Sequence, residues 1–402
     1  MKRHVVITAL TSFFFLFIFL VTRFFVTPSA RHDGPLKIAF VYDGDESIPY
    51  TSNFMRAENA VREQFGDKVE IITRSNVTGD ETEATLEALA EDDCAIIFTA
   101  SYSQTIIAKE YAEKYPHIQF CQATGDNANE APYLKNYHTF MGEIYQGRYV
   151  SGIVAGMKLK DLIDKKVITK KEAKVGYVAA YPYPEVISGF TAFFLGVRSV
   201  VPTATMNVIY TYTWGSFSQE KLCAEQLIDE GCVVISQHSD TTGPAVACEE
   251  AFAKNVFHIG YNQSMVNIAP MTSLTSTRIN WSPYILGAVK AVLENKEIEH
   301  SIKGHQHGND MSAGFDLGWV QLLELNPIIS PEGTAEKVTE TIQAFKKGNV
   351  SVFKGDYIGV NPYDEDDTYD LKKEFKENAT MSSPQFCYIL KDVISVEEQS
   401  LF

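Results

Sequence analysis

Short apolar segments alternate with helical segments along most of this chain, and this alternation limits the folds that it can adopt. The first unit is an apolar run at residues 37–42, a turn at residues 43–49 and an amphipathic helix from Asn53 onward. Further strands are predicted at residues 69–73, 95–98, 117–121 and 136–140, with helices at residues 80–90 and 106–114. Because a repeated strand–helix order favours parallel strands with right-handed crossovers, we expect an α/β fold with a doubly wound sheet.

The same plan is repeated in the second part of the chain. Strands are predicted there at residues 175–179, 207–212, 233–237, 258–261 and 272–277. A length of 402 residues suits two domains better than one. We therefore expect two similar α/β lobes joined in mid-chain. The lysine-rich residues 158–174 should be a solvated surface excursion, and the acidic tail after Gly355 should lie at the surface.

The composition of the chain limits its possible partners. Hydrophobic residues make up 45% of the chain and charged residues 21%, which is typical of a globular protein. The formal net charge of −16 would repel the phosphates of a nucleic acid, and no strong cluster of Lys and Arg offsets that repulsion. We therefore expect no nucleic-acid partner.

Residues 1–30 differ from the rest of the sequence. Lys2 and Arg3 precede an apolar run from Val5 to Val21. This pattern predicts either a signal peptide cut near Ala30 or an uncleaved N-terminal membrane anchor with its positive end in the cytoplasm. Both alternatives place the body of the protein outside the cytoplasm, in the periplasm or at the outer face of the cell membrane.

The six cysteines show neither the CxxC spacing nor the Cys/His spacing of a zinc site, so we expect no metal. Small buried hydrophobic residues are the favoured interpretation, and a disulfide is the alternative. The cysteines are Cys94, Cys121, Cys223, Cys232, Cys248 and Cys387.

Aromatic side chains predominate where the predicted strands end. In doubly wound sheets ligands bind beyond the carboxyl ends of the strands, so these residues should line a crevice. Such a set of residues fits a flat heteroaromatic ligand, which two rings can sandwich while a few polar groups contact its edge.

Tyr50 from the first lobe and Trp214 from the second would be the two rings. Plain packing is the alternative for each. The other candidates are Phe54, Tyr102, Asp240 and Asn262, with Arg278 from a later segment.

Motifs of common enzyme classes are missing from the sequence. It contains no GxGxxG, no GxxxxGK[ST] and no GxSxG. The glycines at 142, 147, 152 and 156 lie at the start of a predicted helix or within it, where small residues allow close packing. With no evident nucleophile and base, we expect binding without chemistry, no catalytic residue and no cofactor.

Several segments together resemble one known family, the basic membrane protein or PnrA-like substrate-binding proteins of ABC transporters. The resemblance runs from about Lys37 to Gly355. It rests on Tyr50-Thr51, IFTASY at 97–102, FCQATG at 120–125, RYVSGIVAG at 148–156, GYVAAYPYPEV at 176–186, Trp214, ISQHSD at 235–240, GYNQSM at 260–265 and VFKG at 352–355.

This resemblance implies a type I periplasmic-binding-protein fold, with two Rossmann-like lobes joined by a hinge that close on a purine nucleobase or nucleoside. It places Tyr50 and Trp214 as the stacking pair, and Tyr102 in the pocket. Asn262 stands where the family has an edge-reading aspartate, and an amide can also donate a hydrogen bond, so the preferred ligand can differ. Arg278 lies near a lysine that some members direct toward the ribose.

With this resemblance we assign residues 36–142 plus about 280–312 to an N-terminal lobe. Residues 143–279 plus about 313–402 form a C-terminal lobe and tail. The expected function is capture of a purine-like ligand for the permease subunits of an ABC importer, with membrane association through the permease or the N-terminal segment. One alternative is a ligand sensor with a membrane signalling partner. Another is a nucleoside-cleaving enzyme, for which Asp43, Asp126 or Asp240 would have to act as base or nucleophile.

Overall fold

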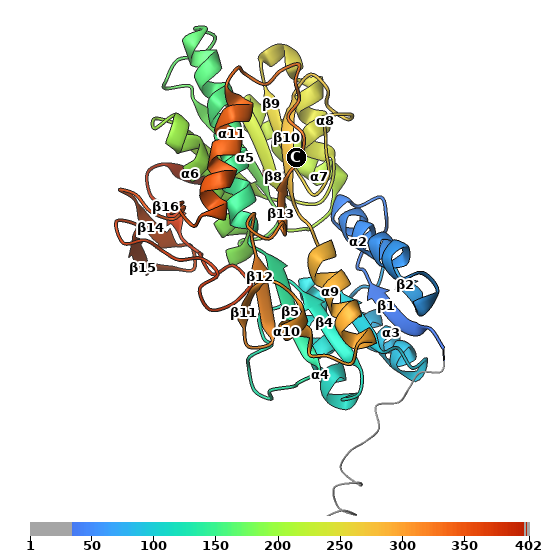
Figure 1. The fold of residues 1–402 in the computed structure, drawn as a ribbon. Helices are drawn as coiled ribbons and strands as arrows, with labels where there is room; N and C mark the ends of the chain where they lie inside the picture. The colour runs from blue at the N-terminus through green and yellow to red at the C-terminus, as the bar shows by residue number, and fades with distance from the viewer. Residues whose placement is uncertain (1–33, 398, 400–402) are drawn as a thin grey trace, which may run out of the picture. The chain divides into compact units, whose positions relative to one another are not determined.

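The computed structural model describes residues 34–397 and residue 399, and the predictions for residues 1–30 lie outside this part of the chain. Two seven-stranded sheets and one three-stranded sheet organise the described residues (Figure 1). We call each large sheet, with the helices that pack on it, a lobe.

The N-terminal lobe is built on a sheet with the strand order β11-β12-β5-β4-β3-β1-β2. Neighbouring strands from β12 to β1 are parallel, and β11 is antiparallel to β12. The strands are β1 (Leu36–Val41), β2 (Val69–Arg74), β3 (Ile96–Thr99), β4 (Gln119–Ala123), β5 (Tyr137–Gly142), β11 (His305–His307) and β12 (Asp310–Ala313). The helices are α2 (Pro49–Phe65), η1 (Gly66–Lys68), α3 (Gly79–Glu91), η2 (Tyr102–Gln104), α4 (Thr105–Lys114), α9 (Ser282–Leu293) and α10 (Ile298–Ser301).

The C-terminal lobe repeats this plan with the strand order β13-β10-β9-β8-β6-β7-β17. Its strands are parallel except β13, which is antiparallel to β10. The strands are β6 (Lys174–Ala179), β7 (Thr205–Tyr210), β8 (Val234–His238), β9 (Phe257–Tyr261), β10 (Ser273–Ile279), β13 (Val320–Leu322) and β17 (Ile394–Glu397). The helices are α5 (Ile144–Asp164), α6 (Pro184–Val200), α7 (Phe217–Asp229), α8 (Gly243–Glu250), η3 (Phe252–Lys254) and α11 (Thr334–Lys346).

The chain passes between the lobes at three places. These are residue 143 between β5 and α5, residues 280–281 between β10 and α9, and residues 314–319 between β12 and β13. The expected α/β class with two doubly wound lobes is therefore present. The domain boundaries given above remain a prediction. Movement of the two lobes relative to each other also remains a prediction.

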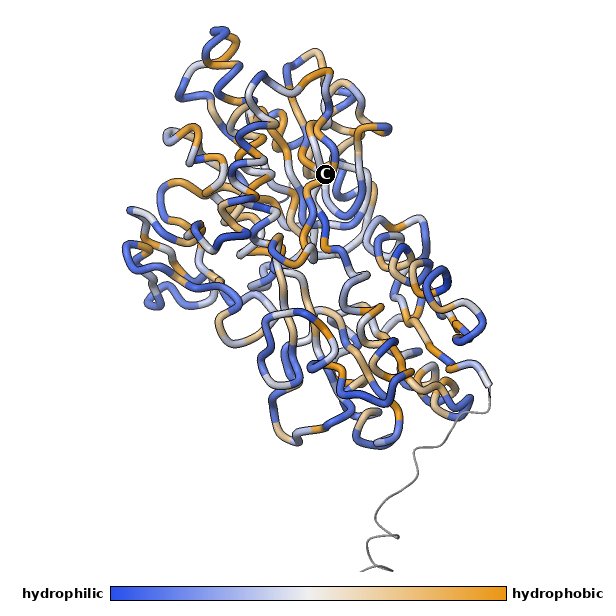
Figure 2. Tube along the Cα trace, in the orientation of Figure 1, coloured by the Kyte–Doolittle hydropathy of each residue, from blue (hydrophilic) through white to orange (hydrophobic). Residues whose placement is uncertain are grey.

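Each lobe buries its own apolar core. One cluster in the N-terminal lobe gathers residues of β1, α3, β3, α4 and β4, and one in the C-terminal lobe gathers residues of β6, β7, α7, β8 and α8. Figure 2 shows apolar residues running through the two large sheets and the helices beside them. The six cysteines are free and five of them are buried, as expected for small hydrophobic residues.

The two segments expected at the surface are largely exposed, but each also has a buried part. Helix α5 continues to Asp164, and Lys158 in its last turns is buried, with its Nζ donating to the Ile329 carbonyl at 2.9 Å. Its long aliphatic stem can pack inside while the ammonium finds acceptors. The acidic residues of the tail are mostly exposed, as expected, in β15 (Asp364–Asp370). The tail also forms β14 (Ile358–Asn361) and β16 (Ile389–Leu390), and then β17 at the edge of the C-terminal sheet.

Candidate ligand-binding site

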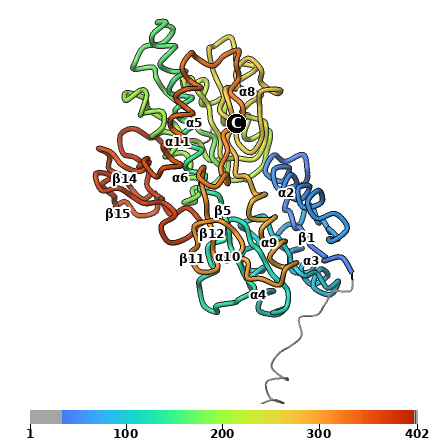
Figure 3. The backbone as a smooth tube through the Cα atoms, in the orientation of Figure 1, coloured from blue at the N-terminus to red at the C-terminus, as the bar shows by residue number. Residues whose placement is uncertain are grey.

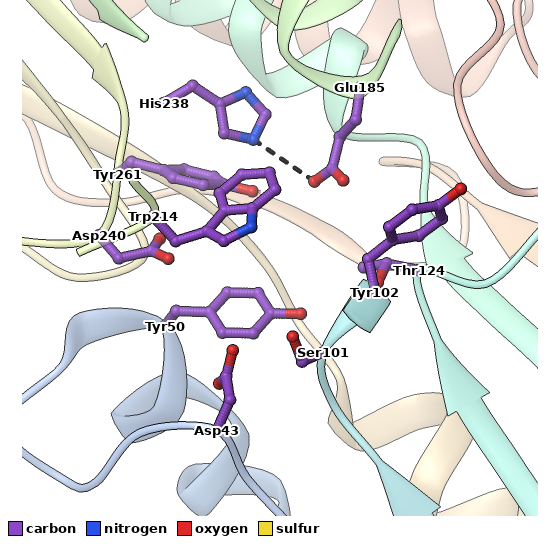
Figure 4. Close-up of a pocket in the computed structure, with 10 residues that line it drawn as sticks. All are labelled: Asp43, Tyr50, Ser101, Tyr102, Thr124, Glu185, Trp214, His238, Asp240 and Tyr261. Atoms are coloured by element: carbon purple, nitrogen blue, oxygen red, sulfur yellow. Dashed lines mark ion pairs between the residues drawn. The ribbon is translucent and has the colours of Figure 1, made fainter. Parts of the chain in front are cut away.

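A pocket lies between the two lobes, where the strands of both sheets end. It has an empty volume of about 390 Å³, with the open solvent at its mouth included. Five of its lining residues come from each lobe (Figure 4). They are Asp43, Tyr50, Ser101, Tyr102 and Thr124 from the N-terminal lobe, and Glu185, Trp214, His238, Asp240 and Tyr261 from the C-terminal lobe.

Tyr50 lies in the first turn of α2, directly after Pro49 has begun the helix. Its hydroxyl donates to the Ala100 carbonyl at 2.7 Å, and this bond fixes the direction of the ring. Burial is the main cause that raises the pKa of Tyr50 well above its usual value, so the phenol stays neutral. Tyr50 therefore offers an uncharged, oriented ring to the pocket.

Phe54 is one helical turn further along α2 and does not line the pocket. It is 1% exposed and stacks on Trp281 with ring centroids 4.2 Å apart. Its ring also meets the edge of Tyr50 at 5.2 Å. The structure thus gives Phe54 a packing role beneath Tyr50, because Trp281 occupies the face that a ligand would need.

Trp214 lies on the loop between β7 and α7, and in Figure 4 its indole and the ring of Tyr50 line the same pocket. Tyr181 contacts the indole edge-on at 5.3 Å, and Tyr183 lies 6.3 Å away. The Trp214 carbonyl accepts a hydrogen bond from the backbone N–H of Asp240 at 2.8 Å, which joins two of the pocket loops. The two rings predicted as a stacking pair are thus brought together from different lobes.

Tyr102 lies at the rim of the pocket and is 44% exposed. Its hydroxyl donates to Asp126 Oδ2 at 3.0 Å. Its ring lies 6.4 Å from that of Tyr183, which belongs to the other lobe. Burial, followed by the nearby Asp126 carboxylate, raises the pKa of Tyr102 to about 12.

Three carboxyl groups, those of Asp43, Glu185 and Asp240, line the pocket, and no Lys or Arg lines it. Burial and the nearby carboxylates raise the pKa of Asp240 well above its usual value. Asn262 is buried behind Asp240 and donates from its Nδ2 to Asp240 Oδ1 at 3.3 Å. Asn262 does not line the pocket, and the side chain that reaches the pocket at this place is Asp240.

His238 lies at the end of β8 and is, among the described residues, the one histidine that lines the pocket. Burial, and next the positive charge of Arg148, lower the pKa of His238 to about 4, so the ring is neutral near pH 7. Its Nε2 lies 3.4 Å from Glu185 Oε1. Arg148 is fully buried, with its guanidinium 3.7 Å from the centre of the Tyr261 ring. This cation lies behind an aromatic wall of the pocket and does not line it.

Arg278 lies away from the pocket. Its side chain is held along the neighbouring strand, since Nε donates to Gln321 Oε1 at 3.0 Å and the two residues are register partners in β10 and β13. Sequence reasoning did not select Glu185, Tyr261, Ser101 or Thr124. Ser101 and Thr124 follow predicted strands and Tyr261 ends one, so the rule about strand ends could have found all three. Glu185 carries no such signal.

Two further searches cover the described residues. In residues 34–397 no group of three or more His, Cys, Asp or Glu side chains is placed to hold a metal ion. Within the same part of the chain, no helix combines the length and the apolar character needed to cross a membrane.

Comparison with known proteins identifies relatives of the whole fold. A purine-binding protein of Brucella abortus is 28% identical over 337 residues, covering 83% of this chain and 88% of that protein. A Haloferax volcanii protein, provisionally named as the ABC transporter glucose-binding protein TsgA13, is 29% identical over 300 residues, covering 75% and 69%.

A solved structure of an ABC transporter solute-binding protein from Aeropyrum pernix has the same fold. It superposes with a TM-score of 0.62 at 19% identity, covering 79% of this chain and 87% of that one. Residues 36–352 match the family described as ABC transporter substrate-binding protein PnrA-like. Substrate-binding proteins are ligand carriers and not enzymes, and in ABC importers they work outside the cytoplasm with permease partners. This chain belongs to the PnrA-like family of ABC transporter substrate-binding proteins.

Proposed function

We propose that this protein binds a purine nucleobase or nucleoside in the pocket between its lobes and delivers it to the permease of an ABC importer. The observation that carries the proposal is the pair of rings, Tyr50 from one lobe and Trp214 from the other, on one pocket. A planar base between these rings would contact both lobes at once. Such a ligand stabilises the closed arrangement over any open one, because only the closed arrangement offers both contacts.

The polar groups of the pocket suit the edge of a purine. Ionised carboxylates accept hydrogen bonds from ring N–H and exocyclic amino groups, and the hydroxyls of Ser101 and Thr124 can both donate and accept. The neutral His238 ring carries one N–H donor. Because the lining has carboxyl groups and no Lys or Arg, a phosphate group would be repelled. The expected ligands are therefore unphosphorylated.

The relatives support two ligand classes. The Brucella abortus relative is named for purine binding, and the Haloferax volcanii relative is named for glucose. Sugars also bind to aromatic faces and carboxylates, so glucose is the second candidate. Trp214 and Tyr50 favour the purine, because a flat ring system can be covered on both faces.

Titration calorimetry with the purified full-length protein tests the proposal. The panel is adenine, guanine, hypoxanthine, their ribonucleosides, AMP and glucose. We expect one-to-one binding of at least one base or nucleoside, and AMP binding at least about tenfold weaker than adenosine because of charge repulsion. No free base should form when nucleosides are incubated with the protein. Tight binding of glucose alone, or release of free base, would contradict the proposal.

A further inference from the structure

The C-terminal segment, residues 353–397, lies beyond the residues that match the family. It contains β14, β15 and β16 and ends in β17. Phe353, Phe375 and Phe386 form its aromatic core, with the rings of Phe353 and Phe386 stacked at 4.4 Å. Strand β17 then runs parallel to β7, with Ile394 opposite Met206. The segment is thus an ordered part of the C-terminal lobe.

This segment packs beside α6, the helix that begins next to the pocket (Figure 3). Two side-chain hydrogen bonds join them at points that bracket Glu185. The Tyr363 hydroxyl donates to the Pro182 carbonyl at 2.8 Å. One turn into α6, the Ser188 hydroxyl donates to Glu377 Oε2 at 2.6 Å. Glu377 is itself buried and accepts backbone N–H groups within the segment, so it is a fixed anchor.

Residues 181–188, next to these two bonds, carry one residue that lines the pocket and two that support Trp214. Glu185 lines the pocket and contacts His238. Tyr181 and Tyr183 stack on each other at 5.1 Å and pack against Trp214. A shift of Pro182 would therefore move both a pocket carboxylate and the side chains that hold the indole in place.

The same segment also reaches the N-terminal lobe. The backbone N–H of Ser382 donates to Asp310 Oδ2 at 2.5 Å, and Asp310 Oδ1 accepts from the Thr139 hydroxyl at 2.8 Å. Asp310 and Thr139 belong to β12 and β5, the strands that lead into two of the crossings between lobes. The C-terminal segment is thus attached to both lobes.

We propose that the C-terminal segment is part of the ligand-binding apparatus, and that Tyr363 and Glu377 are positioning residues for the pocket. They hold residues 181–188 in the arrangement that presents Glu185 and supports Trp214. Neither residue lines the pocket, so each acts through the chain that it anchors. The expected effect of these residues on ligand affinity rests on the proposed function. Their expected effect on the position of the Trp214 indole does not.

Tyr363→Phe tests this inference with a small change, because Tyr363 is 69% exposed and the variant loses only a hydroxyl. Tyr369→Phe is the matched control: its hydroxyl donates to the Glu374 carbonyl at 3.2 Å inside the same segment. Of the three tryptophans, Trp281 and Trp319 are 2% and 1% exposed whereas Trp214 is half-buried, so acrylamide quenching of fluorescence reports mainly on Trp214.

Without ligand, we expect stronger acrylamide quenching in Tyr363→Phe than in wild type, with Tyr369→Phe unchanged. Ser188→Ala should act in the same direction, and the double variant more strongly. With the purine that the wild type binds, Kd should rise about threefold to tenfold in Tyr363→Phe, the range expected for one lost hydrogen bond. In a protein that already carries Glu185→Gln, Tyr363→Phe should raise Kd by a smaller factor. Tyr363 acts on binding in part by positioning Glu185, so the two substitutions are not additive.

Quenching of Tyr363→Phe equal to that of Tyr369→Phe would overturn the inference, whatever the protein binds. Equal Kd values for the two variants would also overturn it. By contrast, a wild-type protein that binds no purine, together with a quenching change in Tyr363→Phe, would reject the proposed ligand and keep the positioning role.

Discussion

Among single side chains, Trp214 is the one that we expect to contribute most to ligand binding. It packs against Tyr181 and Tyr183, and it lines the pocket together with Tyr50 from the other lobe (Figure 4). Its size and flatness supply contact area that no aliphatic side chain can replace.

Trp214→Ala should weaken binding of the preferred purine by about 5- to 150-fold, since stacking of a base on an aromatic side chain is worth about 1–3 kcal/mol. Calorimetry measures the change. Phe217→Ala is the control, because Phe217 begins α7 on the same loop, is 47% exposed and does not line the pocket. If Trp214→Ala binds as tightly as Phe217→Ala, the stacking pair is not part of the site.

His258 in β9 makes stability depend on pH. Burial lowers the pKa of its fully buried imidazole to about 3, so the folded protein keeps it neutral. The unfolded chain takes up a proton near pH 6.5. Between these values the unfolded state binds more protons, so stability falls as the pH falls. The contribution of His258 is complete above pH 6.5 and is lost progressively below it.

His258→Gln should therefore make the protein less sensitive to acid. Between pH 6.5 and pH 5 the wild type should lose about 2 kcal/mol more of its free energy of unfolding than the variant. Urea unfolding at both pH values measures this difference. Other titrating groups, such as His238 and Asp240, are common to both proteins and cancel in the comparison. The same loss in both proteins would show that His258 does not stay neutral when the protein is folded.

Helices α5 and α6 show how glycine sets the spacing of elements. A Cβ added to Gly152 would lie 1.9 Å from the Phe193 carbonyl oxygen, and one added to Gly196 would lie 2.1 Å from that of Tyr149. Each helix thus meets the backbone of the other. This contact positions both Arg148 and Glu185, which α5 and α6 carry to the site.

Gly152→Ala should destabilise the protein by about 2–3 kcal/mol, because overpacking must push the two helices apart. An alanine in a helix interior is otherwise favoured over glycine by about 0.5–1 kcal/mol. The matched control is Gly79→Ala in the first turn of α3, where an added Cβ meets nothing within 4 Å. Chemical unfolding of both variants gives the comparison. A stable Gly152→Ala protein would mean that the helices can separate at little cost.

At the scale of the whole molecule, binding between two lobes links their stabilities. A ligand at about 100 times its Kd should raise the free energy of unfolding by about 2.7 kcal/mol. Since Tyr50 and Trp214 come from different lobes, calorimetric unfolding with the preferred purine should show the lobes melting together at a higher temperature. If two transitions occur and only one shifts, the ligand binds to a single lobe.

The sequence by itself determined the class of fold and the order of its elements. The strands predicted at 37–42, 95–98 and 233–237 lie within about one residue of β1, β3 and β8. They could be predicted because apolar runs and helical periodicity are local properties of the chain. The rule that ligands bind beyond strand ends also selected Tyr50, Tyr102, Trp214 and Asp240, which do line the pocket.

Only the tertiary structure decided which of two neighbouring residues meets the pocket. Tyr50 and Phe54 are four residues apart on one face of α2, but Trp281, distant in sequence, covers Phe54 and leaves Tyr50 facing the pocket. Asp240 reaches the pocket while Asn262 stays behind it, because the order of strands sets which loop end lies nearer. The attachment of residues 353–397 to both lobes likewise arises from contacts between distant segments, which periodicity and composition do not encode.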